Sequence, residues 1–270
     1  MENYKIVFIG TPKFGAVILE KLIKHYKPVL VITNPDKPKG RNNIITPSPV
    51  KELALKHNIP VQHNFNDINC DLIITAAYGK IIPEKIIDTP KYGSINVHPS
   101  LLPKYRGVSP IQTAILNGEK QTGVTIMLMD KEIDHGPILA QLKHKIADYP
   151  TLEKELAKKG ADLLIEVIPK YIKGKIKPQE QDHTKATFTK IIKKGDGKID
   201  WNKSPQEIER QVKAFNPWPG TFTFDKKSGK RVKILEVEIS NNELLIKKVQ
   251  PEGKKPMDYN DYLKGNDKLF

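Results

Sequence analysis

Residues 4–33 carry the pattern that most restricts how this chain can fold. Residues 4–10 form a near-continuous apolar run, which is typical of a strand buried on both faces of a parallel sheet. A glycine-containing turn leads into a helix with apolar residues at helical spacing up to His25, and a second apolar run follows at 29–33. This order predicts a βαβ unit, and hence an α/β, Rossmann-like domain with a mostly parallel sheet.

The same alternation of strands and helices continues toward residue 172. The turn at residues 10–15 lacks the Gly-x-Gly-x-x-Gly fingerprint of dinucleotide-binding domains, so we exclude NAD as a ligand. Apolar patterns predict strands at 71–77, 123–129 and 137–146, and helices at 49–57, 110–117 and 151–172. We therefore expect the first domain to occupy residues 1–172.

Residues 94–107 place two polar side chains at the end of one predicted strand. Residues 95–98 read Ile-Asn-Val-His, and a strand with this alternation sends Asn96 and His98 to the same face. Pro99 ends the strand, because it lacks the N–H that a central ladder uses. The pair is therefore expected at the carboxyl end of a strand, where open α/β sheets bind their ligands.

An amide and an imidazole at one point suit acyl transfer without a covalent intermediate. Asn96 can donate to a carbonyl oxygen that gains negative charge, and His98 can donate beside it or move a proton. Asp134 can accept from the other imidazole nitrogen and fix its tautomer. No activated nucleophile is apparent, since Cys70 is the only cysteine and no Gly-x-Ser-x-Gly elbow occurs. The ordinary alternative is that these polar residues cap a strand end and a turn.

The composition limits the class of protein. A chain of 270 residues can bury one sizeable core, or one medium domain plus a small one. The single cysteine excludes an internal disulfide, and no Cys/His cluster has the spacing of a zinc site. No apolar run is long enough to span a bilayer, and Met1 leads into the first predicted strand without an apolar leader. We expect a cytoplasmic protein without metal or membrane contact.

The net charge of +14 indicates a polyanionic partner. A Pro/Gly/Asn-rich loop is predicted at 34–49, and its length favours a functional or mobile loop over a simple solvated connection. Its basic residues are Lys37, Lys39 and Arg41. Between residues 170 and 203, ten lysines stand against four acidic residues, so we predict a basic linker at 173–198.

Residues 199–270 are predicted to form a second, smaller domain. Ser204, Pro205 and Glu207 have the spacing of a capping box with proline in the first turn, so a helix should begin there. Short strands are predicted at 221–224, 230–239 and 244–249. Several short strands with turn signals between them suggest a small β-barrel.

The ordered motifs of the whole chain resemble one enzyme superfamily. The motif Asn-x-His-x-Ser-Leu-Leu-Pro at 96–103, then Tyr-Arg-Gly at 105–107 and Asp-x-Gly at 134–136, is similar to the signature of the 10-formyltetrahydrofolate-dependent formyltransferases. From residues 10–14 to Gln-Pro-Glu-Gly-Lys at 250–254, the chain is similar to the methionyl-tRNA formyltransferases. The resemblance implies a formyltransferase domain, a C-terminal OB-like barrel that binds tRNA, and formyl transfer from 10-formyltetrahydrofolate to methionyl initiator tRNA.

The resemblance also implies roles for single residues. Asn96, His98 and Asp134 match the catalytic set. The residues that match the folate-binding segments are Tyr78, Gly79, Ile81, Ser100, Leu101, Leu102 and Pro103. The residues expected to contact tRNA are Lys37, Lys39, Arg41, Lys193 and Lys194. Asn42 and Asn43 stand where the family often has further basic residues, so Arg41 becomes the main expected contact of this loop.

Three other functions share parts of this pattern. A sugar-nucleotide N-formyltransferase has the same catalytic domain, but the basic loop and linker argue against a small acceptor. A formyltetrahydrofolate hydrolase would use water as the nucleophile and has less need of a basic barrel. A non-catalytic RNA-binding protein needs the charge but not the amide, imidazole and carboxylate together. We expect a monomeric enzyme whose partners are the folate and initiator methionyl-tRNA.

We predict that the affinity of the protein for methionyl-tRNA falls steeply with salt. If lysine and arginine neutralise about six phosphates, the logarithm of the association constant should fall with the logarithm of the salt concentration with a slope of about −5. Each phosphate contact releases condensed counterions, and this release produces the slope. Fluorescence anisotropy titrations at several salt concentrations measure this slope. A nearly flat dependence would exclude tRNA as the main partner of the positive charge.

Overall fold

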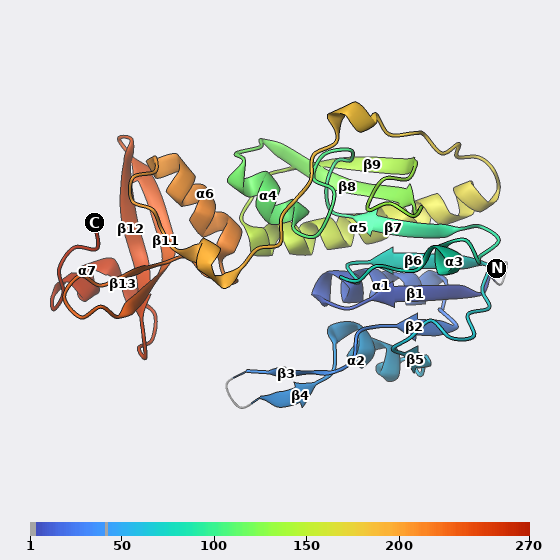
Figure 1. Cartoon of the computed structure of the whole chain (residues 1–270), viewed down its shortest axis with the longest axis horizontal. Coiled ribbons are helices and arrows are strands. Elements are labelled where there is room, and N and C mark those ends of the chain that lie inside the picture. The colour runs from blue at the N-terminus through green and yellow to red at the C-terminus, as the bar shows by residue number, and fades with distance from the viewer. Residues whose placement is uncertain (1–3, 41–42) are drawn as a thin grey trace. The chain divides into compact units, whose positions relative to one another are not determined.

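The computed structural model describes residues 4–40 and 43–270, which form two compact units. Figure 1 shows the helices and strands of both. The first unit contains the chain up to Val108 together with Gln121–Lys145 and Glu153–Thr189. The second unit contains Ser109–Lys120, Ile146–Leu152 and Lys190–Phe270.

A seven-stranded sheet forms the centre of the first unit, in the order β5-β2-β1-β6-β7-β8-β9. Neighbouring strands from β5 to β7 are parallel, whereas β8 is antiparallel to both β7 and β9. The predicted mostly parallel sheet is therefore confirmed. The strands are β1 Ile6–Gly10, β2 Leu30–Ile32, β5 Val61–Gln62, β6 Leu72–Ala76, β7 Ser94–His98, β8 Gln121–Leu128 and β9 Ile138–Lys145.

Helices pack on this sheet because its central strands are apolar on both faces. Every residue of β1 and β6 is buried. Helix α1 spans Lys13–His25 and buries one face that includes Phe14, Ile18 and Leu22. The other helices that connect or flank these strands are α2 Pro49–Lys56, α3 Glu84–Ile87 and α5 Tyr149–Ile172.

The segment predicted as a loop at 34–49 contains a small hairpin, which corrects the sequence analysis. Strand β3 Lys37–Lys39 pairs antiparallel with β4 Ile44–Thr46, apart from the main sheet. The three residues of β4 are all β-branched, so they favour extended backbone despite the Pro/Gly/Asn-rich surroundings. Arg41, the expected tRNA contact, lies outside the described residues.

The second unit contains a four-stranded antiparallel sheet in the order β10-β11-β12-β13. Helix α6 Pro205–Phe215 begins with the predicted capping box, in which the Ser204 side chain accepts from the Glu207 N–H. The closure of this sheet into an OB-like barrel stays a prediction. The other elements are α4 Pro110–Leu116, β10 Phe222–Phe224, β11 Arg231–Ser240, β12 Glu243–Pro251, β13 Met257–Asp258 and α7 Tyr259–Leu263, with short 3-10 turns η1 His183–Lys185 in the first unit and η2 Lys194–Gly197 here.

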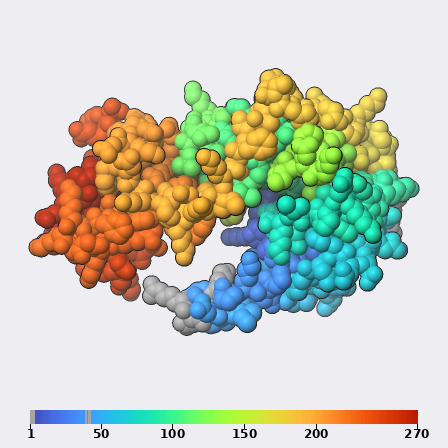
Figure 2. Space-filling view, viewed as in Figure 1, coloured from blue at the N-terminus to red at the C-terminus, as the bar shows by residue number. Residues whose placement is uncertain are grey.

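The predicted linker at 173–198 divides between the two units. Its residues up to Thr189 group with the first unit, where Gln179 forms a β-bridge with Ile138 of β9. In the space-filling view these gold-coloured residues cover part of the first unit's surface (Figure 2). The boundaries proposed from the sequence, at 172 and 198, stay a prediction.

We predict that Gly123→Ala destabilises the first unit. A Cβ at Gly123 in β8 would lie against the Leu142 carbonyl oxygen and the Leu101 side chain, so the substitution overpacks the sheet next to the predicted folate-binding turn. Such overpacking typically costs about 1–3 kcal/mol in the free energy of unfolding. Gly195→Ala is the matched control, because nothing lies within 4 Å of a Cβ there. Urea unfolding that finds both variants equally stable would contradict the packing described here.

Candidate active site

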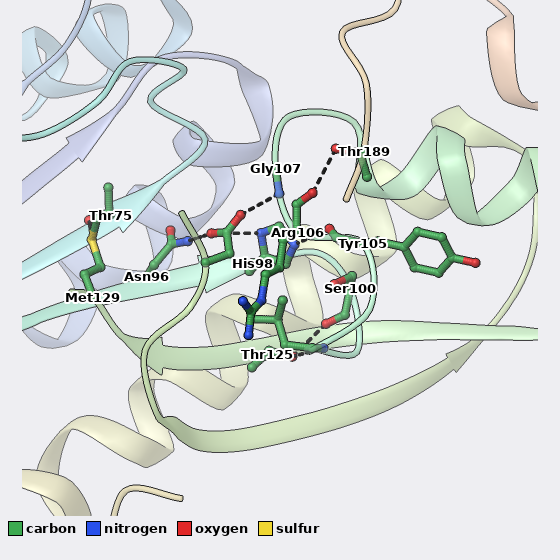
Figure 3. A network of polar contacts seen from close by, with 12 residues as sticks. Thr75, Asn96, His98, Ser100, Tyr105, Arg106, Gly107, Thr125, Met129 and Thr189 are labelled. Carbon is green, nitrogen blue, oxygen red and sulfur yellow. Dashed lines mark hydrogen bonds and ion pairs between the residues drawn. The ribbon is translucent and has the colours of Figure 1, made fainter. Parts of the chain in front are cut away.

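The carboxyl end of β7 brings Asn96 and His98 to the same side of the sheet. Their neighbours Ile95 and Val97 point to the opposite side and are 0% and 1% exposed, so the core fixes which face the polar pair occupies. His98 is buried and Asn96 is half-buried. Figure 3 shows the two side chains next to each other, close to the loop that contains Gly107.

Asp134 reaches this point from the loop between β8 and β9. Its Oδ1 accepts from Asn96 Nδ2 at 3.1 Å, and its Oδ2 accepts from the Gly107 N–H at 2.8 Å. His98 Nδ1 lies 3.5 Å from Oδ1. The amide, imidazole and carboxylate that the sequence predicted as a set therefore meet, although they are up to 38 residues apart in the chain.

One expected contact is corrected by the structure. We expected Asp134 to fix the tautomer of His98, but 3.5 Å is longer than an ordinary N–H···O hydrogen bond. Instead, His98 Nε2 lies 3.0 Å from the carbonyl oxygen of Tyr105. A carbonyl oxygen can only accept, so Nε2 carries the proton and Nδ1 faces Asp134. The backbone of Tyr105 thus orients the ring.

Two residues in the turn after β7 have a left-handed backbone conformation, which residues other than glycine rarely adopt. Tyr105 has a φ of 63° and Gly107 a φ of 105°, both in the left-handed region. Arg106 between them is 3% exposed, and its Nη2 donates to Gln181 Oε1 at 2.8 Å and contacts His183 Nδ1 at 2.9 Å. The buried guanidinium is thus held by two side chains from a later segment of the chain.

The comparisons with known proteins identify the family. The family model described as formyl transferase matches residues 4–172, and the one described as formyl transferase, C-terminal domain, matches residues 191–244. A methionyl-tRNA formyltransferase of Dictyoglomus thermophilum is 39% identical, over 97% of this chain and 96% of its own length. One of Enterococcus faecalis is 47% identical, over 81% of this chain and 75% of its own length. The chain belongs to the methionyl-tRNA formyltransferase family.

Solved structures show the same fold in proteins with more distant sequences. A methionyl-tRNA formyltransferase from Clostridium thermocellum superposes with a TM-score of 0.62 at 19% identity, covering 92% of this chain and 98% of that one. An N-formyltransferase from Helicobacter canadensis, in complex with folinic acid and dTDP-3-aminofucose, gives 0.68 at 23% identity, covering 94% and 98%. These structures confirm the fold, and the family models and the curated relatives confirm the resemblance that the sequence motifs indicated.

In this member of the formyltransferase family, several of the predicted folate-binding residues serve local structure. Ser100 is fully buried, and its hydroxyl donates to the Lys104 carbonyl at 2.7 Å. Leu102 is buried, and its N–H donates to Thr125 Oγ1. Tyr78 is buried in an edge-on contact with Phe65, and this burial raises the pKa of its phenol. The contacts of Ser100 and Leu102 hold the turn after β7, whereas Tyr78 packs in the core.

The other predicted folate contacts are more accessible. Ile81 is 82% exposed, and a Cβ added at Gly79 would meet nothing within 4 Å. Leu101 and Pro103 are half-buried on either side of Leu102. The folate-binding role of all these residues stays a prediction.

Those predicted tRNA contacts that the structure describes come from other elements than the ones that carry Asn96, His98 and Asp134. The side chain of Lys37 is exposed in the β3–β4 hairpin, and Lys39 lies in the same strand. Lys193 and Lys194 are exposed residues of the second unit.

Within residues 4–40 and 43–270, no group of three or more His, Cys, Asp or Glu side chains could hold a metal ion. Across that same part of the chain, every helix is too short or too polar to cross a bilayer.

Sequence reasoning missed three residues that build the site. Tyr105 and Arg106 belong to a quoted motif, but nothing in the sequence indicates that the Tyr105 backbone contacts His98. Gln181 lies 75 residues after Arg106 and stands in a segment without periodicity, so no pattern places it here. Contacts between residues so far apart in the sequence are determined by the whole fold and not by local spacing.

We predict that the neutral ring of His98 carries its proton on Nε2. The Tyr105 carbonyl 3.0 Å away accepts only a proton-bearing nitrogen, whereas Nδ1 has no acceptor at ordinary hydrogen-bond distance. Nitrogen-15 NMR of histidine-labelled protein at alkaline pH reads this directly, with His98→Gln to assign the signal. A proton found on Nδ1 would contradict the geometry.

Proposed function

We propose that this protein transfers a formyl group from 10-formyltetrahydrofolate to the α-amino group of methionine on initiator tRNA. The observation that carries the proposal is the meeting of Asn96, His98 and Asp134 at the end of β7, in a chain of the methionyl-tRNA formyltransferase family. The product, N-formylmethionyl-tRNA, starts translation. The folate is a substrate that donates its one-carbon unit.

The reaction needs groups that stabilise charge and accept a proton. The neutral amine attacks the formyl carbon, a C–N bond forms, and the formyl oxygen becomes negative in a tetrahedral intermediate. The bond from that carbon to N10 of the folate then breaks, and N10 takes a proton as the amine nitrogen loses one. Donors aimed at the oxygen and a carboxylate near the amine are therefore the groups to look for.

We propose one of these tasks for each of the three residues, and the geometry supports each assignment. Asn96 uses one amide N–H for Asp134 and keeps a second N–H for the developing oxyanion. The Nε2–H of His98 donates to the Tyr105 carbonyl, so Nδ1, which lies beside Asp134, is the nitrogen left to donate to the oxyanion when the ring is protonated. Both carboxylate oxygens of Asp134 have a second lone pair with which to accept the amine proton.

The tRNA is the partner that suits the charge of the chain. A net charge of +14 favours a polyphosphate, and Lys37, Lys39, Arg41, Lys193 and Lys194 are the proposed contacts. We propose that the C-terminal unit forms an OB-like, tRNA-binding domain. Both substrates occur in the cytoplasm, where we expect the protein to act as a monomer.

A sugar-nucleotide formyltransferase is the strongest competing function. The Helicobacter canadensis enzyme binds folinic acid and an amino-sugar nucleotide on the same fold, so fold alone does not separate the two. Its identity to this chain is 23%, whereas the Enterococcus faecalis methionyl-tRNA formyltransferase reaches 47%. The higher identity favours methionyl-tRNA as the acceptor.

An acceptor comparison tests the function. The protein is incubated with formyl-labelled 10-formyltetrahydrofolate and either methionyl-tRNA, an amino-sugar nucleotide or buffer, and the label is followed. We predict label on methionyl-tRNA only. Label on the sugar, or free formate in buffer, would assign one of the other functions.

We predict that Asn96→Ala lowers kcat by about 10²–10³, because it removes one donor to the oxyanion. Its affinity for methionyl-tRNA should stay nearly unchanged, since the proposed phosphate contacts lie elsewhere. Asn64→Ala is the matched control, because Asn64 only accepts from the Asn66 N–H in an exposed turn. An unchanged kcat in Asn96→Ala would remove Asn96 from the site.

A further inference from the structure

A segment outside both matched family domains lies against the active site. We define the strap as residues 179–189, which follow the first matched domain, ending at 172, and precede the second, beginning at 191. Its ends form β-bridges in the first unit, Gln179 with Ile138 and Phe188 with Arg106. Figure 3 shows Thr189 of the strap next to the Arg106–Gly107 turn.

Gln181 of the strap holds the loop that carries Asp134. The side chain is 5% exposed, and its Nε2 donates to the Asp134 carbonyl at 2.9 Å and to the Gly136 carbonyl at 2.7 Å. Its Oε1 accepts from Arg106 at 2.8 Å. Asp134 has a φ of 50°, in the left-handed region that aspartate enters more readily than most residues other than glycine. The Nε2 end of the Gln181 amide holds this backbone, and Arg106 fixes the other end of the amide.

Thr187 of the strap holds the turn that orients His98. The Tyr105 N–H donates to Thr187 Oγ1 at 2.8 Å, and the Arg106 N–H donates to the Thr187 carbonyl at 2.8 Å. Tyr105 also has a left-handed φ, and its carbonyl is the acceptor for His98 Nε2. The Tyr105 carbonyl and the Arg106 N–H belong to one peptide group, which the Thr187 carbonyl holds, while the Thr187 hydroxyl holds the preceding peptide group through the Tyr105 N–H. Thr187 therefore fixes the backbone on both sides of Tyr105.

We infer that Gln181 and Thr187 are positioning residues of the active site. Gln181 places Asp134 and Thr187 places His98, each through the backbone of a left-handed residue. The strap thereby sets the geometry of the two ionisable groups through hydrogen bonds to the backbone. This inference rests on the proposed function for its kinetic consequences, but not for its structural ones.

The first test removes one hydroxyl. Thr187→Val keeps the shape and the backbone bond to Arg106 but loses the acceptor for the Tyr105 N–H. We predict a fall in kcat of about tenfold, the effect of one hydrogen bond, with the KM for methionyl-tRNA unchanged. Thr187→Ser keeps the hydroxyl and should restore the rate. Thr184→Val is the matched control, because the Thr184 hydroxyl donates to Asp182 within the strap.

A second readout does not depend on activity. Nitrogen-15 NMR should show the Nε2–H tautomer of His98 in the wild type and in Thr184→Val, and a mixture of tautomers in Thr187→Val. An unchanged tautomer and kcat in Thr187→Val would overturn the role of Thr187. Equal losses in Thr187→Val and Thr184→Val would overturn it as well. If the wild type does not formylate methionyl-tRNA, the proposed function fails, and the tautomer alone decides the inference.

Gln181→Glu tests the role of Gln181 in positioning Asp134. The substitution keeps an acceptor for Arg106 but places a carboxylate oxygen against the carbonyl oxygens of Asp134 and Gly136. We predict a loss of kcat of at least about tenfold at unchanged KM and a shifted pH profile, since Asp134 moves relative to the amine. A wild-type rate and pH profile in Gln181→Glu would overturn the role of Gln181.

Discussion

The Asp134 carboxylate is the group on which the arrangement of the active site depends. It accepts from the Asn96 amide on one oxygen and from the Gly107 N–H on the other, so the strand end and the following turn are both fixed relative to it. His98 lies 3.5 Å from the same carboxylate. A carboxylate held by two donors in a largely buried position is fixed in place, so under the proposed function little reorganisation is required when the amine approaches.

The fold brings these groups together at a change in strand direction. β7 is parallel to β6 and antiparallel to β8, so β8 ends beside Ile95, near the start of β7. The loop between β8 and β9 then carries Asp134 back to the side chains of Asn96 and His98. The strap pairs with the start of β9 through Gln179 and holds both the loop and the turn.

Much of this could be predicted from the sequence where local pattern decides the outcome. Alternation placed Asn96 and His98 on one face of β7, and the capping box placed the start of α6. The hairpin β3–β4 was missed because proline and glycine dominate the composition around three β-branched residues. The two-residue β5 and β13 are too short to leave a pattern.

The details of the candidate site were less predictable for a different physical reason. The amide, imidazole and carboxylate follow from motif and chemistry, but the acceptor for His98 is a backbone carbonyl, and any residue type supplies one. The φ of Tyr105 and the contacts of Thr187 depend on segments 82 residues apart. Such contacts are selected by the packing of the whole unit, and single-sequence reasoning has no access to them.

We propose that Asn96 and Asp134 act as one unit around the formyl group during its transfer. A double-mutant cycle in kcat/KM for methionyl-tRNA, with Asn96→Ala and Asp134→Ala alone and combined, measures their coupling directly. We predict that the losses in kcat/KM are strongly non-additive, so that the double variant is no slower than the slower single variant. Losses that simply multiply would show that the two side chains act independently and would contradict this proposal.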